Sequence, residues 1–518
     1  MDERGPAVAA FYTWLATNGL DVECPDHVKF RLATFPWTGR GTRATVPIHE
    51  EDVLASVPRQ LILSAVTATD SRVVRDVLPA VEGTILADPM VALALLLLYE
   101  KNLGPASFWA PYFHILLLPP LCRFVPLLAW WQQTKRNKPV QWIVYYNLPI
   151  FWSSEDLVLL EEAHTDILPH SRNMRTSILR LYFGFLLPLF HLLIFISIFK
   201  DYPDMFSPAV HTCDELMWAF ATIWSRGYWL DGDDTMPAIV PLADMLNHNT
   251  EKGGERVAHY FYDADAQIFK VISKTSYEPG QQVLTHYGNK ANGNFLEDYG
   301  FVYMNNDQNE FYLPIPAFVT QHMGPTHLRH VHSLIALRNI ANAEHVYVKH
   351  NVFPSAVCNL FRTYLLSPAQ LCSALDLPPV EHFQPETYDG ADPSSLSFSS
   401  SSTPEAADGT TQEPVAELTY FVDVENEMAT YELFIRCCDH WLASYSTTMA
   451  DDAAFIEGRM GSGPSNNNNA RMVRTLLHEE KRTIVHLRDC FEQMIAYVRD
   501  TGVDWAHVRL LDGQHVPK

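Results

Sequence analysis

The chain has 518 residues, of which 19% are charged and 47% hydrophobic, and its formal net charge at pH 7 is -23. This length accommodates two or three domains with sizeable cores. The acidity excludes general affinity for nucleic acid, because a phosphate-binding surface needs clustered Lys and Arg. A protein substrate with a basic segment would suit this charge, although acidity also simply keeps a protein soluble.

The eight cysteines are scattered, without a Cys-x-x-Cys pair. Cys437 and Cys438 are adjacent and cannot easily face one metal ion. We therefore expect reduced, mostly buried thiols in an intracellular protein, with neither a disulfide framework nor a zinc site. The first residues are charged and lead into an amphipathic segment, so we expect no secretory signal.

The N-terminal part predicts three short elements. Apolar residues between 11 and 20 predict a helix that ends at Gly19. Residues 28–35 alternate as a strand, and Gly39-Arg40-Gly41 is predicted to be the turn after it. Small residues there let a ligand lie against backbone N–H and C=O groups. An ordinary hairpin turn is the alternative, and the local sequence alone favours it.

Two further helices are predicted before the middle of the chain. Residues 88–103 are apolar on most sides, which predicts a buried helix that begins at Pro89. Residues 214–228 carry apolar side chains on one side, and Arg226 is predicted to end that helix. An acidic loop follows at 231–234.

The stretch 241–302 has the character of a binding site. A short apolar run ends in the pattern Asp244-x-x-Asn247-His248, whose side chains and freed backbone can hold a polar ligand. A predicted hairpin over 258–272 follows. The last part places Gly beside Tyr twice, at Tyr287-Gly288 and at Tyr299-Gly300. Gly lets the backbone approach a ligand closely while a phenol stays at the edge.

Beyond residue 311 the sequence predicts helices. Helical apolar spacing occurs over 331–341, 357–366, 420–444 and 472–500. The segments near 385–416 and 461–469 are rich in small and polar residues, which predicts mobile loops. No repeat of fixed period is evident.

Five motifs in this order resemble those of a known enzyme family. The patterns Asp-x-x-Asn-His, Tyr-Gly-x-x-x-Asn and Tyr-Gly-Phe-Val are similar to the catalytic half of a SET-domain protein methyltransferase. The subgroup contains the Rubisco large-subunit lysine methyltransferase, the ribosomal-protein lysine methyltransferases and the actin-histidine methyltransferase. One such motif is weak, whereas five in order are a specific signature. The motifs cover 39–44 with 57–58, 107–112, 224–228, 244–248 and 287–302.

The resemblance implies an α+β fold, in which a knotted, β-rich SET domain is interrupted by a helical insert and followed by an all-α C-terminal domain. A knot would be an exception to the usual threading of chains. The implied parts are 1–104 (N-terminal SET segment and start of the insert), 105–215 (helical insert), 216–310 (catalytic SET segment) and 311–518 (a substrate-binding domain like that of the Rubisco enzyme).

The resemblance also implies S-adenosyl-L-methionine as cofactor, with Tyr287 as the catalytic residue that accepts a hydrogen bond from the substrate amine. Asn247 and His248 would contact the adenine and carboxy-propyl parts, and Arg226 the cofactor's carboxylate. Asp244 would brace this loop. By themselves, an isolated Tyr is more often structural and His248 could be a core histidine. The remaining implied cofactor residues are Gly39, Gly41, Arg43, Gly300 and Phe301, and the substrate channel would be lined by Tyr228, Tyr299 and Phe301.

Two apolar segments, 117–145 and 184–199, depart from the family pattern. Three explanations are open: translated introns, real helices packed on the insert, and membrane association. With residues 181–183 the second segment approaches the roughly 20 apolar residues that span a bilayer. Pro188 and His191 in its middle argue against a membrane helix.

The favoured function is therefore a lysine N-methyltransferase that acts on a non-histone, possibly ribosomal, protein bound by the C-terminal domain. A histidine substrate and a non-catalytic interaction scaffold are the alternatives. We expect a monomer in the cytoplasm or nucleus, without nucleic-acid or membrane binding and without a metal.

Overall fold

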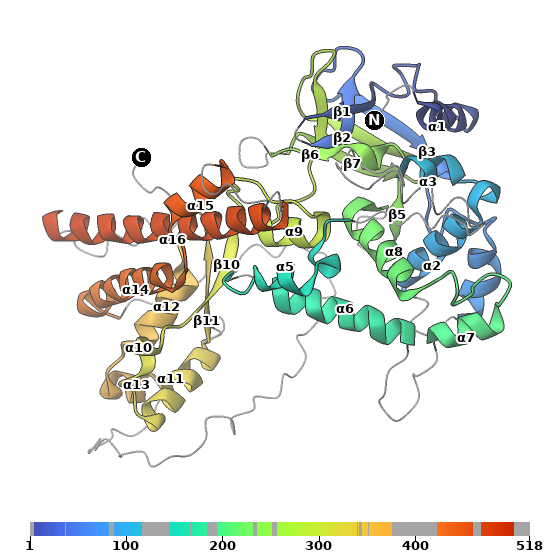
Figure 1. Ribbon diagram of the computed structural model, residues 1–518. Helices are drawn as coiled ribbons and strands as arrows, with labels where there is room; N and C mark the ends of the chain where they lie inside the picture. Colours follow the sequence, from blue (N-terminus) through green and yellow to red (C-terminus); the bar gives the residue numbers. More distant parts are fainter. Residues whose placement is uncertain are drawn as a thin grey trace. The chain divides into compact units, whose positions relative to one another are not determined.

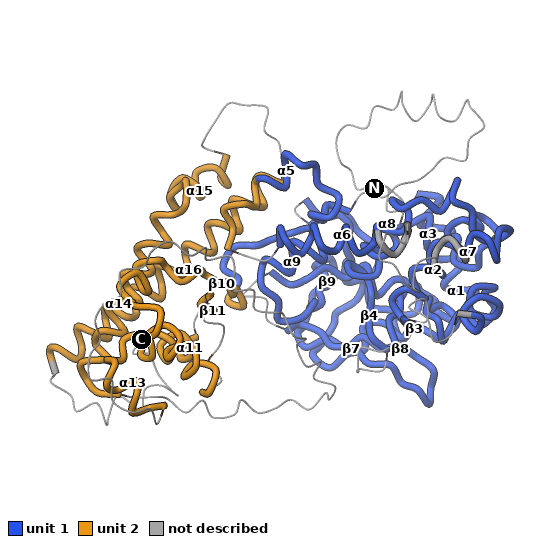
Figure 2. The backbone as a smooth tube through the Cα atoms, turned by 90° about the horizontal axis from the view of Figure 1, so that it is seen from below, with its two compact units in different colours: residues 1–158, 167–306 blue, residues 159–166, 307–518 orange. Residues whose placement is uncertain are grey.

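The computed structural model describes residues 5–36, 38–81, 88–116, 146–164, 167–183, 194–230, 236–250, 256–338, 340, 344–350, 352–375, 422–458 and 468–501. These residues form helices and short sheets (Figure 1). The chain divides into two compact units (Figure 2). Unit 1 contains residues 1–158 and 167–306, and unit 2 contains residues 159–166 and 307–518.

The β-structure of unit 1 consists of small sheets assembled from distant parts of the chain. The largest has the order β1-β2-β9-β6, and a second has the order β3-β8-β7. Strand β6 is only two residues long and lies parallel to β9, whereas β1, β2 and β9 are antiparallel neighbours. The strands are β1 (Phe30–Phe35), β2 (Gly39–Ala44), β3 (Val53–Pro58), β4 (Gly227–Trp229), β5 (Pro237–Ile239), β6 (Asn247–His248), β7 (Ala258–Asp263), β8 (Ile268–Ser273) and β9 (Gln282–Thr285).

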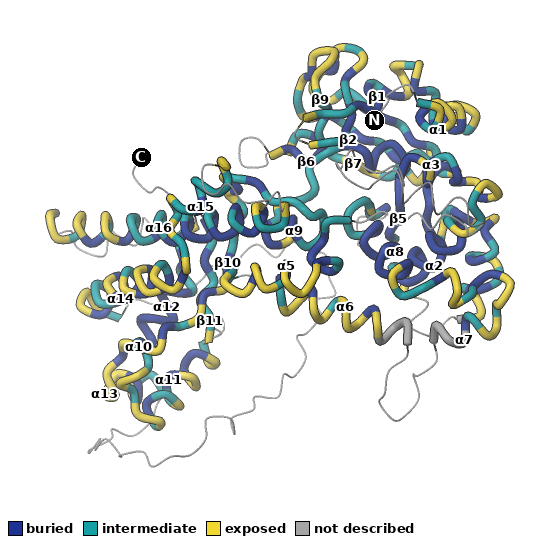
Figure 3. The backbone as a smooth tube through the Cα atoms, in the orientation of Figure 1, coloured by how far each residue is buried: buried dark blue, intermediate teal, exposed yellow. Residues whose placement is uncertain are grey.

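Helices pack around these sheets. The Asp88 side chain caps helix α2 by accepting hydrogen bonds from the N–H groups of Met90 and Val91, so the helix begins at Pro89 as predicted. Residues 91–100 of this helix are all buried (Figure 3). The helices are α1 (Pro6–Thr17), α2 (Pro89–Asn102), α3 (Ala110–Leu116), α5 (Ser154–Val158), α6 (Ile167–Phe183), α7 (Ile194–Asp201), α8 (Cys213–Arg226) and α9 (Asn292–Tyr299).

The glycine motif is not the predicted turn. Gly39, Arg40 and Gly41 lie inside β2, and Gly39 pairs with Phe35 of β1. The prediction was wrong because two glycines usually interrupt a strand. Here Gly41 is needed for close packing, since a Cβ atom on it would lie 2.7 Å from Asn247 Nδ2 and 2.7 Å from Gln282 Nε2.

Unit 2 is mainly helical but not all-α, which corrects the expected fold. Strands β10 (Glu310–Pro314) and β11 (His345–Lys349) form an antiparallel pair whose buried residues alternate with more exposed ones. This period of two extends over only five residues in each strand and lies between longer helical patterns, which dominate the sequence signal. The helices are α10 (Ala317–Thr320), α11 (Pro325–Leu337), α12 (Ser355–Tyr364), α13 (Pro368–Ala374), α14 (Val424–Ser444), α15 (Met449–Ile456) and α16 (Asn468–Thr501).

Several predictions fall on residues outside the described part of the chain. Segment 117–145 lies there completely, as do residues 184–193, whereas α7 begins at Ile194. The predicted loop near 385–416 and residues 461–467 are also outside it. No helix among the described residues is long and apolar enough to cross a membrane. The knot stays a prediction.

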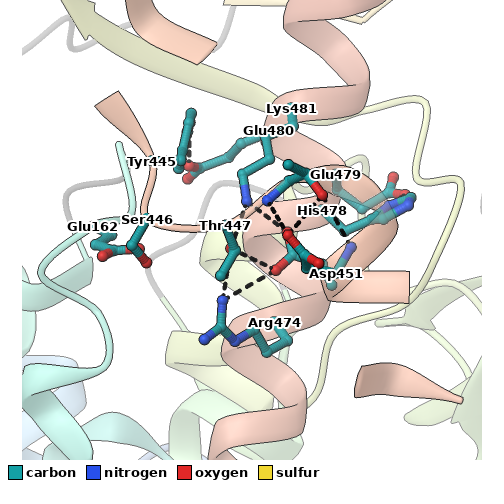
Figure 4. A network of polar contacts seen from close by, with 12 residues as sticks. Glu162, Tyr445, Ser446, Thr447, Asp451, Arg474, His478, Glu479, Glu480 and Lys481 are labelled. Carbon is teal, nitrogen blue, oxygen red and sulfur yellow. Dashed lines mark hydrogen bonds and ion pairs between the residues drawn. The ribbon is translucent and has the colours of Figure 1, made fainter. Parts of the chain in front are cut away.

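A network of buried charges lies on α16 of unit 2 (Figure 4). Lys481 Nζ lies 2.6 Å from Asp452 Oδ2, and Arg474 Nη1 lies 3.1 Å from Asp452 Oδ1. Next to it, one oxygen of Glu480 accepts hydrogen bonds from the Tyr445 hydroxyl at 2.8 Å and from the His164 N–H at 3.2 Å. The other oxygen of Glu480 is buried and has no hydrogen-bond partner among the described residues.

This environment makes the stability of unit 2 depend on pH. Burial raises the pKa of Glu480 from 4.5 to about 8, against the opposing effect of its two hydrogen bonds. The folded state therefore binds a proton that the unfolded state releases, so stability falls as pH rises from about 4.5 to about 8. We expect Glu480→Gln to remove this loss, on the order of a few kcal/mol, above the window.

Hydrogen exchange of the α16 amides in the whole protein, below, within and above that pH window, measures the effect. Glu492→Gln is the matched control, because Glu492 is on the same helix but its side chain is 56% exposed. A pH dependence that is the same in Glu480→Gln and in Glu492→Gln would contradict the assignment to Glu480.

Candidate active site

Two segments far apart in sequence meet where β6 runs beside β9. Asn247 pairs with Leu284 and His248 with Thr285, and β9 leads directly to His286 and Tyr287. The Tyr287 N–H donates to His248 Nδ1 at 3.1 Å, and the Tyr287 hydroxyl donates to the Leu246 carbonyl at 2.7 Å. The Asp-x-x-Asn-His motif therefore fixes both ends of Tyr287.

The hydroxyl of Tyr287 is a hydrogen-bond donor to protein and an acceptor toward a ligand. Burial raises its pKa to about 12, partly opposed by the positive charge of Arg226. It therefore stays protonated at neutral pH. Because its proton is directed to Leu246, its oxygen lone pairs remain available to a substrate N–H.

Asp244 and Arg226 form a buried ion pair beside this tyrosine. Arg226 Nη1, at the end of α8, lies 3.1 Å from both the carbonyl oxygen and Oδ2 of Asp244. The Tyr112 hydroxyl donates to the same Oδ2 at 2.8 Å. The Asp244 side chain is completely buried, whereas that of Arg226 is 23% exposed. Burial raises the pKa of Asp244, and Arg226 and Tyr112 oppose this rise.

The turn that carries Asp244 is strained. Leu242, which is completely buried, has φ 77° and ψ -46°. A branched residue in this region costs about 1–3 kcal/mol and persists only where the surroundings impose it. Here the Asp244 N–H donates to the Val240 carbonyl at 3.1 Å and the Met245 N–H to the Leu242 carbonyl at 3.2 Å. The Asp244 side chain that follows this turn contacts α3 through Tyr112 and α8 through Arg226.

His248 is a neutral ring inside an aromatic cluster. Burial, with a smaller contribution from His286, lowers the pKa of His248 to about 3. Its Nδ1 accepts the Tyr287 N–H, so the proton is assigned to Nε2. That Nε2 is buried and has no hydrogen-bond partner among the described residues. The ring centroid of His248 lies 4.6 Å from that of Phe295 and 6.1 Å from that of Phe301.

A second group of aromatic rings extends from Tyr287. Tyr299 stacks on it with 4.6 Å between centroids, and Phe301 lies 6.4 Å away in an edge contact. The Tyr228 hydroxyl donates to the Ala243 carbonyl at 2.9 Å. Tyr260, which is 37% exposed, contacts the Tyr228 ring edge-on at 4.8 Å. The rings near the site thus include buried ones, such as Tyr228, and one that is partly exposed, Tyr260.

The arginine that lies near the Asp244 pair is Arg40, not Arg43. Strand alternation places Arg40 and Arg43 on opposite faces of β2. The Arg40 side chain donates to the Ile115 carbonyl at 2.6 Å, and burial, with the charge of Arg226, lowers its pKa to about 10. The Asn247 side chain donates to the Arg40 carbonyl at 2.9 Å.

Two further residues that the resemblance assigns to the cofactor, Arg43 and Gly39, also lie on β2. Arg43 has its guanidinium carbon 5.6 Å from the centre of the Phe35 ring, at the outer part of β2. Gly39 is partly buried and has φ 70°, and a Cβ atom added to it would have no described atom within 4 Å. That either residue binds the cofactor stays a prediction.

Gly300 is required at its position for two independent reasons. It ends α9 in the left-handed conformation, with φ 74°. A Cβ atom would lie 2.8 Å from the Asn147 carbonyl oxygen, which is backbone and cannot move aside cheaply. Asn147 belongs to the Tyr-Asn-Leu-Pro sequence that follows segment 117–145. Gly300 thus lets the loop with Tyr299 and Phe301 pack against that sequence.

We expect Gly300→Ala to lower the free energy of unfolding by more than the about 1–2 kcal/mol that the left-handed conformation alone costs. Gly280→Ala is the matched control, since Gly280 also has a positive φ (94°) but no described atom within 4 Å of the place its Cβ would take. Chemical denaturation measures both. Equal losses in the two variants would contradict the role of the Asn147 contact.

Sequence reasoning missed Arg40, Tyr112 and Tyr260. Arg40 and Tyr112 lie inside recognised motifs, so a search for polar residues in the motifs could have found them. Tyr260 lies in the hairpin strand β7. Nothing in its local sequence distinguishes it, because only the packing of β7 and β8 against β4 brings it to Tyr228.

No family model matches the chain, but known proteins resemble it in sequence and in structure. The chain is 26% identical over 312 residues to the N-lysine methyltransferase setd6 of Xenopus laevis, covering 58% of each protein. It is 24% identical over 301 residues to the actin-histidine N-methyltransferase of Mus musculus, covering 57% of this chain and 42% of that protein. The chain thus spans about half the length of these relatives.

Solved structures show the same fold. The SET domain of LSMT bound to lysine and AdoHcy superposes with a TM-score of 0.58 at 18% identity, covering 98% of this chain and 99% of that chain. Rubisco LSMT bound to AdoMet superposes with a TM-score of 0.56. The predicted resemblance is confirmed: this chain has the fold of the SET-domain protein methyltransferases and is related in sequence to their lysine- and histidine-modifying members.

Proposed function

We propose that the protein is an S-adenosyl-L-methionine-dependent N-methyltransferase that modifies a lysine side chain of a protein. The hydrogen bond from the Tyr287 hydroxyl to the Leu246 carbonyl, 2.7 Å long, is the observation that carries this proposal. This hydrogen bond fixes the Tyr287 oxygen as a hydrogen-bond acceptor among the aromatic rings of Tyr299 and Phe301. The sequence relatives that methylate protein nitrogens and the fold support the same reaction class.

The residues around Asp244 fit the proposed cofactor. Arg40 and Arg226 carry two positive charges against the single negative charge of Asp244, so an added carboxylate would be neutralised there. Two buried donors, Arg226 Nε and His248 Nε2, also lack partners among the described residues. Gly41 allows β2 to pack closely against the Asn247 side chain. When bound, S-adenosyl-L-methionine would supply an activated methyl group on a sulfonium.

The protein's own task is to align an amine and to keep it unprotonated. The aromatic side chains of Tyr287, Tyr228 and Tyr299 exclude water, which disfavours a charged ammonium. The positive charge of Arg226, close enough to affect the pKa of Tyr287, acts in the same direction. A neutral amine can then donate an N–H to Tyr287 and direct its lone pair toward the methyl carbon.

The hydroxyl oxygens of Tyr287 and Tyr228 favour lysine over histidine as the substrate residue. Both Tyr287 and Tyr228 use their hydroxyl protons on backbone carbonyls, so both oxygens face a ligand as acceptors. A lysine amine has N–H groups to satisfy such acceptors. Neutral imidazole has no N–H on its nucleophilic nitrogen and only one on the other ring nitrogen, so it satisfies two such acceptors less well.

We also propose that unit 2 binds the protein substrate. A substrate with basic segments would suit the chain's charge of -23. A non-histone substrate, a monomer and a cytoplasmic or nuclear location stay predictions.

The test is methyl transfer from isotopically labelled S-adenosyl-L-methionine to the proteins of a cell extract, followed by mass spectrometry of modified residues. The expected result is label on lysine. Label on histidine would overturn the lysine assignment and leave the reaction class. Binding of S-adenosylhomocysteine without any methyl transfer would overturn the assignment as an enzyme and favour a non-catalytic interaction scaffold.

A further inference from the structure

A cavity lies in unit 1, apart from the candidate active site. Its volume is about 910 Å³, within the range of ligand pockets. It lies between the end of β3, the residues that follow it, the end of α2 and the turn that joins β7 to β8. None of its lining residues belongs to the cluster around Asp244 and Tyr287.

A buried carboxylate forms part of its wall. Glu100 of α2 is 3% exposed. Its two oxygens accept hydrogen bonds from the hydroxyls of Ser71 and Ser107, at 2.7 and 2.8 Å. Both oxygens of Glu100 therefore act as hydrogen-bond acceptors, each toward one serine. No Lys, Arg or His of the described residues forms an ion pair with it.

The other charges of the lining do not supply a counter-charge. Arg72 is neutralised by Asp76, at 3.3 Å, and by Asp204, at 2.8 Å. Arg59 and Asp70, one of each sign, also line the cavity, and Arg59 is turned toward the oxygens of Gln267 and Val66. The negative charge of Glu100 is therefore not balanced by a positive charge among the described lining residues. A buried charge that is hydrogen-bonded but has no opposite charge beside it is still costly, and a bound cation would reduce that cost.

Aromatic side chains form another part of the lining. Tyr99, Phe108 and Trp109 all line the cavity, and the rings of Phe108 and Trp109 meet edge-on at 5.0 Å. Phe108 is 42% exposed, although it is a large apolar side chain. A carboxylate beside aromatic rings is the combination that binds an organic cation, through its charge and through its aliphatic part.

We propose that this cavity binds an organic cation, an ammonium or guanidinium group, whose charge pairs with Glu100. The group could belong to a free small molecule or to an Arg or Lys side chain of a protein. The proposal does not depend on methyl transfer, since it uses none of the residues assigned to it.

The test is calorimetric binding to the full chain with S-adenosylhomocysteine in excess, so that the candidate active site is occupied. The probes are agmatine, an acetylated peptide with one central Arg, and the same peptide with neutral citrulline instead. We expect the Arg peptide or agmatine to bind and the citrulline peptide to bind at least about tenfold more weakly. Binding of agmatine alone identifies a small-molecule site, and binding of the peptide identifies a side-chain site.

The variant Glu100→Gln keeps the size of the side chain and removes its charge, and is expected to weaken cation binding at least about tenfold. Glu50→Gln, an exposed position outside the cavity, is the control and should leave binding unchanged. If Glu100→Gln melts early, Phe108→Ala at the exposed aromatic wall replaces it and should also weaken binding. Equal binding of Arg and citrulline peptides, unchanged binding in the variants, or no binding of any probe at millimolar concentration would overturn the proposal.

Discussion

Replacing Tyr287 by Phe is expected to lower kcat for methyl transfer by about 10²-fold or more, the range found when one positioned proton acceptor is removed. The substitution keeps the ring, which stacks on Tyr299 at 4.6 Å, and the backbone N–H that donates to His248 at 3.1 Å. It removes the oxygen that the Leu246 carbonyl holds in place. The substrate amine then loses its hydrogen-bond acceptor and its alignment, while the surrounding aromatic rings stay in place.

Single-turnover methyl transfer measures the effect of Tyr287→Phe on the reaction step, and calorimetric binding of S-adenosylhomocysteine measures its effect on cofactor binding. Binding should change little, because Tyr287→Phe leaves the Arg226–Asp244 pair intact. The matched control is Tyr262→Phe on β7, since the Tyr262 hydroxyl is buried without a partner among the described residues and removing it should have little effect. A Tyr287→Phe protein that transfers methyl groups as fast as this control would remove Tyr287 from its assigned role.

The second large effect is expected from Arg226→Met. This substitution leaves the Asp244 carboxylate completely buried with only the Tyr112 hydroxyl as a strong partner among the described residues. Removing one partner of a buried ion pair costs about 3–5 kcal/mol. Because the Arg226 side chain is 23% exposed, water can replace part of the lost interaction, and the lower end of this range applies. Chemical denaturation of the whole protein measures the loss.

The pH dependence of the stability of Arg226→Met tests whether the unpaired charge of Asp244 causes the destabilisation. Burial already raises the pKa of Asp244, and loss of Arg226 removes the charge that opposes this rise. A carboxyl group with a raised pKa in the folded state loses stability as pH increases through the range between the unfolded and folded pKa values. The destabilisation by Arg226→Met should therefore be larger at neutral pH than in acid.

Adding Asp244→Asn should recover part of the stability and flatten the pH dependence, because the unpaired charge is then absent. Arg75→Met is the surface control, since the Arg75 side chain is 59% exposed and its ion pair with Asp76 contributes at most about 1 kcal/mol. If the double variant is less stable than Arg226→Met at neutral pH, an uncompensated Asp244 is not the cause.

Local sequence was sufficient for the longer elements. The Asp-Pro sequence at 88–89 determines where α2 begins, since Asp88 caps the helix and proline is suited to its first position. The order of the short motifs was also sufficient to indicate the fold that the solved structures share. These features depend on neighbours a few residues away, which a linear pattern contains.

The placement of side chains in the site depended on contacts across the chain. Tyr112 and Asp244 are 132 residues apart, and Tyr287 and Leu246 are 41 residues apart. Whether Arg40 or Arg43 approaches Asp244 depends on which face of β2 meets α3, and the sequence leaves both faces possible. The pair β10–β11 was missed for the same reason, since neither strand has a partner nearby in sequence.

The sequence by itself determined which residues can carry the chemistry: the phenol of Tyr287, the charged side chains of Arg226 and Asp244, and the motif glycines. Only the tertiary structure decided where they point, because a two-residue strand such as β6 has no preference of its own and takes its direction from the hydrogen bonds of β9.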